Sequence, residues 1–181
     1  MSATVLVLPG YGDSGPAHWQ TLWERRHGYA RVVQDDWERP ELAAWKRRLS
    51  EALDRVAGPV VLVAHSLGCA LVAHVASERL ADRVAGALLV APPDVDELQH
   101  LLPEVASFAP MPMRRLPFPS IVVASRNDPY AEPARVRAFA EAWDARLVDV
   151  GEAGHVNAES NLGDWCEGHC LLEELLRVTS R

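Results

Sequence analysis

The hydrophobic positions of the chain fall into two alternating patterns. Short apolar runs recur along the sequence, and between them hydrophobic residues repeat at helical spacing. This alternation predicts repeated βα units around a mostly parallel sheet of about six strands. The expected strands are Thr4–Leu8, Arg31–Gln34, Val60–Ala64, Val84–Ala91, Ser120–Ala124 and Arg146–Val150. The expected helices are Ala17–Arg26, Pro40–Val56, Leu67–Leu80, Glu132–Trp143 and Trp165–Val178.

Three of the strand runs are continuously apolar, around Val60, Val84 and Ile121. Strands that lack polar alternation are buried on both faces, so we expect helices on both sides of the sheet. Several prolines interrupt the segment between residues 92 and 119, which predicts a short helix near Val95–Ser107 followed by a loop. These elements use up the available length, and we therefore expect a single α/β domain without a cap domain.

Composition and charge exclude several function classes. The 181 residues form one domain over residues 1–181 in this interpretation, and the net charge is −7. Lys46 is the single lysine and no basic cluster is present, so binding to nucleic acid or to an anionic membrane is disfavoured. The strand pattern starts at Thr4 without a preceding basic region, so no signal peptide is visible. We expect a cytoplasmic protein.

The three cysteines do not indicate a disulfide framework or a metal site. Cys69, Cys166 and Cys170 are an odd number without a CxxC pair. Cys166 and Cys170 would share a helix face beside His169, but a fourth ligand is missing. We expect small, half-buried thiols, no metal and no cofactor.

Three of the predicted strands are followed by residues that could form a catalytic set. Ser66 follows the strand at Val60, Asp128 follows the strand at Ser120, and His155 follows the last strand. The carboxyl ends of parallel strands meet at one edge of a sheet, where ligands bind. The order Ser, Asp, His is also the order of the triad in hydrolase sheets. We therefore expect Ser66 as nucleophile, His155 as general base and Asp128 as the carboxylate that orients it.

Each of these residues has a simpler alternative role. Ser66 could cap the following helix, because Ala64 stands where the Gly-x-Ser-x-Gly turn has its first glycine. Asp128 precedes a proline, which is typical of an ordinary turn. Asp94, which follows the strand at Val84, is the second candidate for the acid. A lone loop histidine such as His155 is usually a surface residue.

The glycine-rich loop after the first strand could complete an oxyanion hole. The expected donors are the backbone N–H groups of Leu67, next to the nucleophile, and Tyr11. The residues expected to line the substrate pocket are Gly12, His18, Trp19, Trp23, His65 and Pro93, with part of the 108–118 loop.

The same loop also fits the G-x-G-x-x-G fingerprint of dinucleotide-binding folds, through Gly10, Gly12 and Gly15. Against that interpretation, a phosphate at this helix start would face Asp13, and the chain lacks a second catalytic domain.

Several segments together carry a resemblance to a known family. They are Leu8-Pro9-Gly10-Tyr11-Gly12 with His18-Trp19 and Trp23, Gln34-Asp35-Asp36-Trp37, Ala64-His65-Ser66-Leu67-Gly68, Ser125 with Asn127-Asp128-Pro129, and Gly154-His155-Val156-Asn157 with Gly163-Asp164-Trp165. The chain resembles the α/β-hydrolase superfamily, and more narrowly the small serine hydrolases related to retinoblastoma-binding protein 9 and the YdeN-type proteins. The resemblance implies a hydrolase sheet without a cap, the triad Ser66–Asp128–His155 and esterase-like activity on small-molecule esters. It does not imply a protein partner.

A different function class also remains open, a hydrolase scaffold that binds a partner without catalysis. The chain has six tryptophans, a residue type that is enriched at binding surfaces, and Trp19 and Trp23 would share one helix face. Core or pocket lining is the more common role of such residues.

Overall fold

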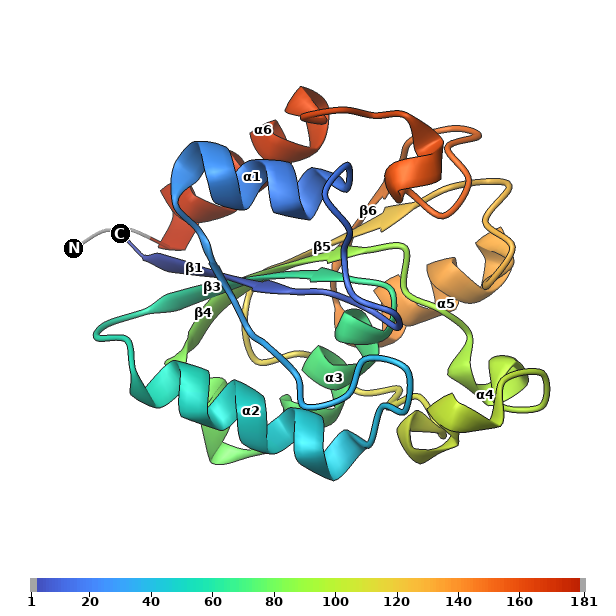
Figure 1. The fold of residues 1–181 in the computed structure, drawn as a ribbon, viewed down its shortest axis with the longest axis horizontal. Coiled ribbons are helices and arrows are strands. Elements are labelled where there is room, and N and C mark those ends of the chain that lie inside the picture. The colour runs from blue at the N-terminus through green and yellow to red at the C-terminus, as the bar shows by residue number, and fades with distance from the viewer. Residues whose placement is uncertain (1–2, 180–181) are drawn as a thin grey trace.

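The computed structural model describes residues 3–179, which form a six-stranded parallel sheet with helices on both faces (Figure 1). The strands are β1 (Thr4–Leu8), β2 (Ala30–Arg31), β3 (Val60–His65), β4 (Val84–Val90), β5 (Ser120–Ala124) and β6 (Arg146–Asp149). Their order across the sheet is β2-β1-β3-β4-β5-β6, and every neighbouring pair is parallel. No inserted cap domain interrupts the described residues. The predicted fold class is confirmed.

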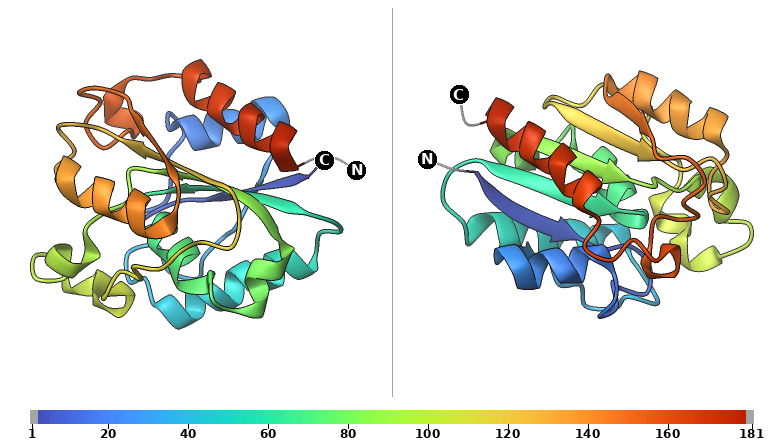
Figure 2. Two further views of the ribbon diagram at one scale, coloured as in Figure 1. Left: turned by 180° about the vertical axis from the view of Figure 1, so that it is seen from behind. Right: turned by 90° about the horizontal axis from the view of Figure 1, so that it is seen from above.

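Helices α1 and α6 lie on one face of the sheet, and α2, α3 and α5 lie on the other (Figure 1; Figure 2 shows α6 from above and α5 from behind). The α-helices are α1 (Trp19–His27), α2 (Leu42–Asp54), α3 (Leu67–Val75), α4 (Val95–Leu98), α5 (Pro133–Trp143) and α6 (Cys166–Thr179). Three short 3-10 helices are η1 (Arg79–Arg83), η2 (Pro103–Phe108) and η3 (Ala158–Ser160).

The central strand β3 contributes side chains to two separate hydrophobic cores. Successive side chains of a strand point to opposite faces, so Val61 and Val63 pack in the core under α1 and α6, whereas Leu62 packs in the core over α2, α3 and α5. All three are fully buried. This explains why the β3 sequence is apolar without alternation, and it places β3 in the interior of the molecule.

Some predicted boundaries were wrong. Strand β2 has two residues instead of four, because the chain leaves the sheet edge after Val32 and Val33 is 62% exposed. Helix α3 ends at Val75 rather than at Leu80, and the chain continues as the 3-10 helix η1. The single helix expected near Val95–Ser107 is divided into α4 and η2, with Pro103 at the start of η2.

None of the helices within residues 3–179 has an apolar stretch long enough to cross a membrane. The three cysteines are free, but the expectation of half-buried thiols was wrong, because Cys69 is buried and Cys166 and Cys170 are exposed.

Candidate active site

Ser66 occupies a strained turn between β3 and α3. Its backbone has φ 52° and ψ −124°, a conformation that residues other than glycine rarely adopt. The Ser66 N–H donates to the carbonyl of Val90 on the neighbouring strand β4 (2.9 Å), which fixes the turn from one side. The Ser66 side chain makes no capping hydrogen bond to α3. The simple helix-cap role is therefore wrong.

Small residues allow the backbone around Ser66 to pack closely. A Cβ atom on Gly68 would lie 2.4 Å from the carbonyl oxygen of Leu8, and one on Gly10 would lie 2.7 Å from the Ser66 Cβ. Real Cβ atoms do not come this close to other atoms, so both positions require glycine. Ala64 is fully buried, which shows that its extra methyl group fits at the first small position of the turn.

A chain of hydrogen bonds links Ser66 to His155 and Asp128. The Ser66 hydroxyl donates to His155 Nε2 (2.8 Å), and His155 Nδ1 lies 2.9 Å from both carboxylate oxygens of Asp128. An ionised carboxylate only accepts, so Nδ1 carries the imidazole proton and Nε2 presents a lone pair to Ser66. The Asp128 side chain is 1% exposed. Asp94, the alternative acid, instead forms an ion pair with Arg135 (3.1 Å).

The loop that carries Asp128 is tied directly to the loop that carries His155. The Asn127 side-chain oxygen accepts from the Gly154 N–H (2.7 Å), and the Ser125 hydroxyl accepts from the Ala153 N–H (2.9 Å). Ser125 also donates to Asn127 (2.9 Å). These bonds fix the distance between the two loops at the ends of β5 and β6. This bridging role was not predicted from the sequence, although both residues lie close after the buried strand β5.

Two side chains from other elements hold the backbone of the His155 loop. His65 Nε2 donates to the His155 carbonyl (2.9 Å), and the indole N–H of Trp19 donates to the Val156 carbonyl (2.8 Å). Val156 is buried with φ 50°, an unusual conformation for a β-branched residue. The loop is thus anchored on both sides of a strained position.

Two backbone donors next to Ser66 are free. Among residues 3–179 the N–H groups of Leu67 and Tyr11 form no hydrogen bond. Leu67 is the first residue of α3, where N–H groups have no partner within the helix, and Gly10 packs directly against Ser66. An oxyanion formed on a carbonyl attacked by Ser66 needs donors of this kind.

His18 is a neutral, buried imidazole at the start of α1. Burial, with the nearby positive charge of Arg31 as a smaller cause, lowers its pKa to about 4. His18 Nδ1 accepts from the Gln20 N–H (3.2 Å), which leaves the proton on Nε2. That atom is buried and has no hydrogen-bond partner among the described residues. The His18 ring packs edge-on against His65, whose pKa is also lowered, mainly by burial.

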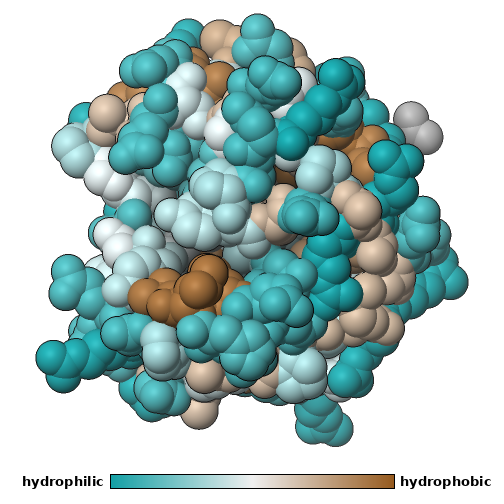
Figure 3. Space-filling view, turned by 90° about the vertical axis from the view of Figure 1, so that its right-hand side faces the viewer, coloured by the Kyte–Doolittle hydropathy of each residue, from teal (hydrophilic) through white to brown (hydrophobic). Residues whose placement is uncertain are grey.

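A cavity of about 620 Å³ opens over Ser66 at the carboxyl ends of the strands. Figure 3 faces this end of the molecule and shows a compact hydrophobic patch among hydrophilic side chains. The cavity is lined by Tyr11, Asp13, Gly15, His18, His65, Ser66, Leu67, Pro93, Leu98, Leu101, Leu102, Val105, Pro129, Tyr130, His155, Asn157, Ala158 and Glu159. Ser66 and His155 thus share one accessible space.

Comparisons with known proteins agree with this geometry. Residues 5–174 match the serine hydrolase family. A YdeN-like hydrolase from Pectobacterium atrosepticum is 34% identical, with 98% of this chain and 92% of that chain covered and a TM-score of 0.88. The chain belongs to the serine hydrolase family. The ydeN gene product of B. subtilis (20% identity, 97% and 100% covered, TM-score 0.74) and esterase 2 of Thermogutta terrifontis (20%, 97% and 82%, TM-score 0.69) share the fold. The sequence has no significant match among curated proteins.

The structure corrects three of the pocket residues predicted for this serine hydrolase. Trp19 and Trp23 are 1% and 0% exposed and do not line the cavity. They pack with Trp165 between α1 and α6, and the Trp23 indole N–H donates to the Asp164 carbonyl (2.6 Å). Gly12 is also absent from the lining, because its left-handed turn directs its N–H to the Trp37 carbonyl (2.9 Å).

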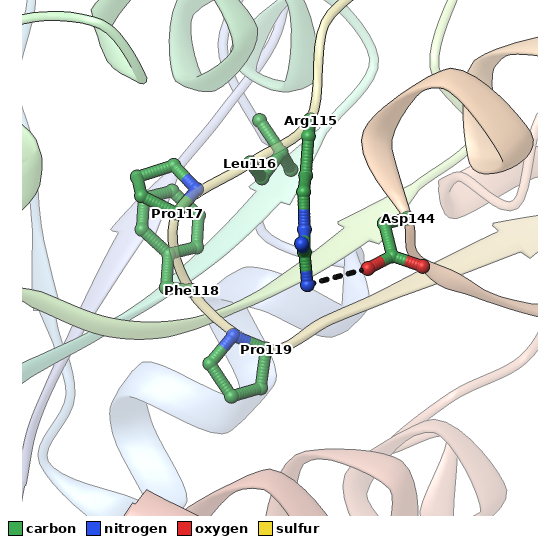
Figure 4. Close-up of a pocket in the computed structure, with 6 residues that line it drawn as sticks. All are labelled: Arg115, Leu116, Pro117, Phe118, Pro119 and Asp144. Carbon is green, nitrogen blue, oxygen red and sulfur yellow. Dashed lines mark ion pairs between the residues drawn. The ribbon is translucent and has the colours of Figure 1, made fainter.

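The apolar wall of the hydrolase cavity comes from α4 and η2 and not from the 108–118 loop. A second hollow, of about 530 Å³, lies near part of that loop at the opposite end of β5 (Figure 4). Prolines and Phe118 line it, and the exposed Arg115 and Asp144 form an ion pair across it (2.9 Å). No nucleophile or histidine lines this hollow among the described residues, nor do those residues contain a cluster of ligands that could hold a metal.

Proposed function

We propose that this serine hydrolase is a carboxylesterase that cleaves small-molecule esters through an acyl-enzyme on Ser66. The observation that carries the proposal is the hydrogen-bond chain from Ser66 through His155 to Asp128, which opens into the cavity at the strand ends. Esterase 2 of Thermogutta terrifontis, which shares this fold, is consistent with the proposal.

In the first half of the reaction, Ser66 Oγ attacks the ester carbonyl carbon while His155 Nε2 takes the hydroxyl proton. Asp128 holds the His155 tautomer and stabilises the imidazolium that forms. The N–H groups of Leu67 and Tyr11 bind the oxyanion of the tetrahedral intermediate. His155 then returns the proton to the alkoxide oxygen as the carbon–oxygen bond breaks, and the acyl group stays on Ser66.

In the second half, His155 takes a proton from water, and the resulting hydroxide attacks the acyl carbon. The bond to Ser66 Oγ breaks, Oγ regains the proton from His155, and the carboxylic acid leaves. The same residues thus act twice, as base and then as acid. The reaction consumes one ester and one water and needs no cofactor.

A fluorophosphonate probe on the intact protein tests the proposal. We expect one covalent adduct on Ser66 by mass spectrometry, and none on the Ser66→Ala variant. We also expect wild-type protein to hydrolyse p-nitrophenyl butyrate and Ser66→Ala to lose this turnover by several orders of magnitude. A folded wild-type protein that is neither labelled nor active would favour the non-catalytic scaffold instead.

A further inference from the structure

The cavity over Ser66 has two chemically different walls. One wall is apolar and consists of Pro93, Leu98, Leu101, Leu102 and Val105, from α4, η2 and the residues next to them. Leu101 is 85% exposed, so this wall presents apolar surface to solvent. The other wall carries His155 and the polar residues of the η3 segment, Asn157 and Glu159.

The two walls lie on opposite sides of the sheet. Phe108 of η2 packs against Trp45 of α2, which places the apolar wall on the α2 and α3 side. The hydrogen bond from Trp19 to Val156 ties the segment after His155 to α1 on the other side. Figure 1 shows α4 below the sheet and the segment 156–162 above it.

This arrangement gives the two halves of an ester different places. His155 donates its proton to the departing oxygen, so the alcohol portion must leave on the His155 side. The acyl chain then extends toward the opposite wall, which is the apolar one. A hydrocarbon chain gains free energy there by leaving water, whereas a polar acyl group does not.

The charged residues around the cavity indicate the charge of the substrate that it can bind. No lysine or arginine is among the described residues that line it. The carboxylate of Asp13 is paired with Arg31 (2.8 Å), and Glu159 forms no ion pair within the described part of the chain. A phosphate-bearing carrier on the acyl group would find no cationic partner here and would face Glu159.

We propose that the wall formed by α4 and η2 binds the acyl chain of uncharged medium-chain esters and gives the hydrolase a preference for them over acetyl esters. This inference rests on the esterase function proposed above. Transfer of one methylene from water to an apolar site changes the binding constant about four-fold. An acyl chain that is covered on one side gains about half of the corresponding free energy, which is roughly two-fold in the constant per methylene. Six methylenes separate acetyl from octanoyl, so kcat/KM should rise roughly 60-fold between them.

The test is a series of p-nitrophenyl esters from acetate to octanoate, assayed below the concentration at which the longer esters form micelles. We expect kcat/KM to rise with chain length and the Leu101→Asp variant to lower the octanoate-to-acetate ratio about ten-fold. Val33→Asp is the matched control, because Val33 is 62% exposed and does not line the cavity. It should leave the ratio unchanged.

A flat or falling chain-length series overturns the inference, and so does an unchanged ratio in Leu101→Asp. A second assay tests the uncharged substrate class. It compares the hydrolysis of octanoyl-coenzyme A with that of an uncharged thioester of the same acyl group, p-nitrothiophenyl octanoate. Faster hydrolysis of the coenzyme A thioester would contradict the uncharged substrate class. Fluorophosphonate labelling of Ser66 separates these outcomes from failure of the proposed function, since a labelled enzyme that prefers acetate is still a serine esterase.

Discussion

The imidazole of His65 holds the backbone of His155, with Nε2 donating to the His155 carbonyl 2.9 Å away. His65 precedes Ser66 in the chain, so one turn supplies both the hydroxyl of the proposed nucleophile and a support for His155, the proposed general base. The bond acts on the backbone of His155 and leaves the His155 ring free to exchange protons. We assign His65 a positioning role.

Replacing His65 should therefore affect catalysis more than binding. In His65→Leu the His155 carbonyl loses its partner, and a shift of the imidazole lowers kcat about ten- to a hundred-fold, with a smaller change in KM. His65→Gln keeps a donor at a similar reach and should recover part of the loss. Steady-state kinetics with p-nitrophenyl butyrate measure both constants. An unchanged kcat in His65→Leu would remove the positioning role.

The roles of Asp128 and Asp94 can be distinguished by matched substitutions. Asp128→Asn replaces the acceptor for His155 Nδ1–H and favours the wrong tautomer, so kcat should fall about 10⁴-fold, as for the corresponding change in a serine protease triad. Asp94→Asn weakens the ion pair with Arg135 and should retain activity while it lowers thermal stability. The opposite ranking in the same ester assay would transfer the acid role to Asp94.

The Trp19 indole N–H should stabilise the His155 loop. Trp19→Phe keeps a buried ring and removes the hydrogen bond to Val156, which we expect to cost about 1–2 kcal/mol of unfolding free energy and to slow fluorophosphonate labelling. Trp143→Phe is the control, because Trp143 is equally buried and donates to Pro112 over the same distance, 2.8 Å, away from the cavity. It should lose similar stability in urea titrations and label at the wild-type rate. Equal labelling rates in the two variants would count against the anchoring role.

The buried His18 predicts a pH dependence of stability. Its pKa is lowered from 6.5 to about 4, so below pH 6.5 the unfolded chain takes up a proton that the folded chain does not. The contribution to stability is complete above pH 6.5 and is lost as the pH falls toward 4, by roughly 3 kcal/mol in total.

Urea unfolding of wild type and His18→Asn between pH 7 and pH 4 measures this contribution. Asparagine keeps an acceptor for the Gln20 N–H at the start of α1 and does not titrate. The variant should show a smaller decline in stability over this range. The lowered pKa of His65 adds to the decline in both proteins, and because His18 is one of the groups that lower it, the difference between them reports His18 together with its coupling to His65. Identical declines would show that His18 is not the titrating group.

The sequence determined the features that depend on neighbours along the chain. The apolar runs of β3, β4 and β5 predict buried parallel strands, because a strand covered on both faces needs no polar alternation. The placement of Ser66, Asp128 and His155 after three such strands predicts that they meet, because parallel strands end at one edge of the sheet.

Tertiary structure alone decided which residues surround that meeting point. Trp19 is separated by 137 positions from its partner Val156, and no local pattern distinguishes an indole that anchors a loop from one that lines a pocket. The split of the segment 95–108 into α4 and η2, and its position against α2, turned Leu98, Leu101 and Leu102 into a cavity wall. These outcomes depend on packing between elements distant in sequence, whereas helical and strand periodicity records only which face of an element is buried.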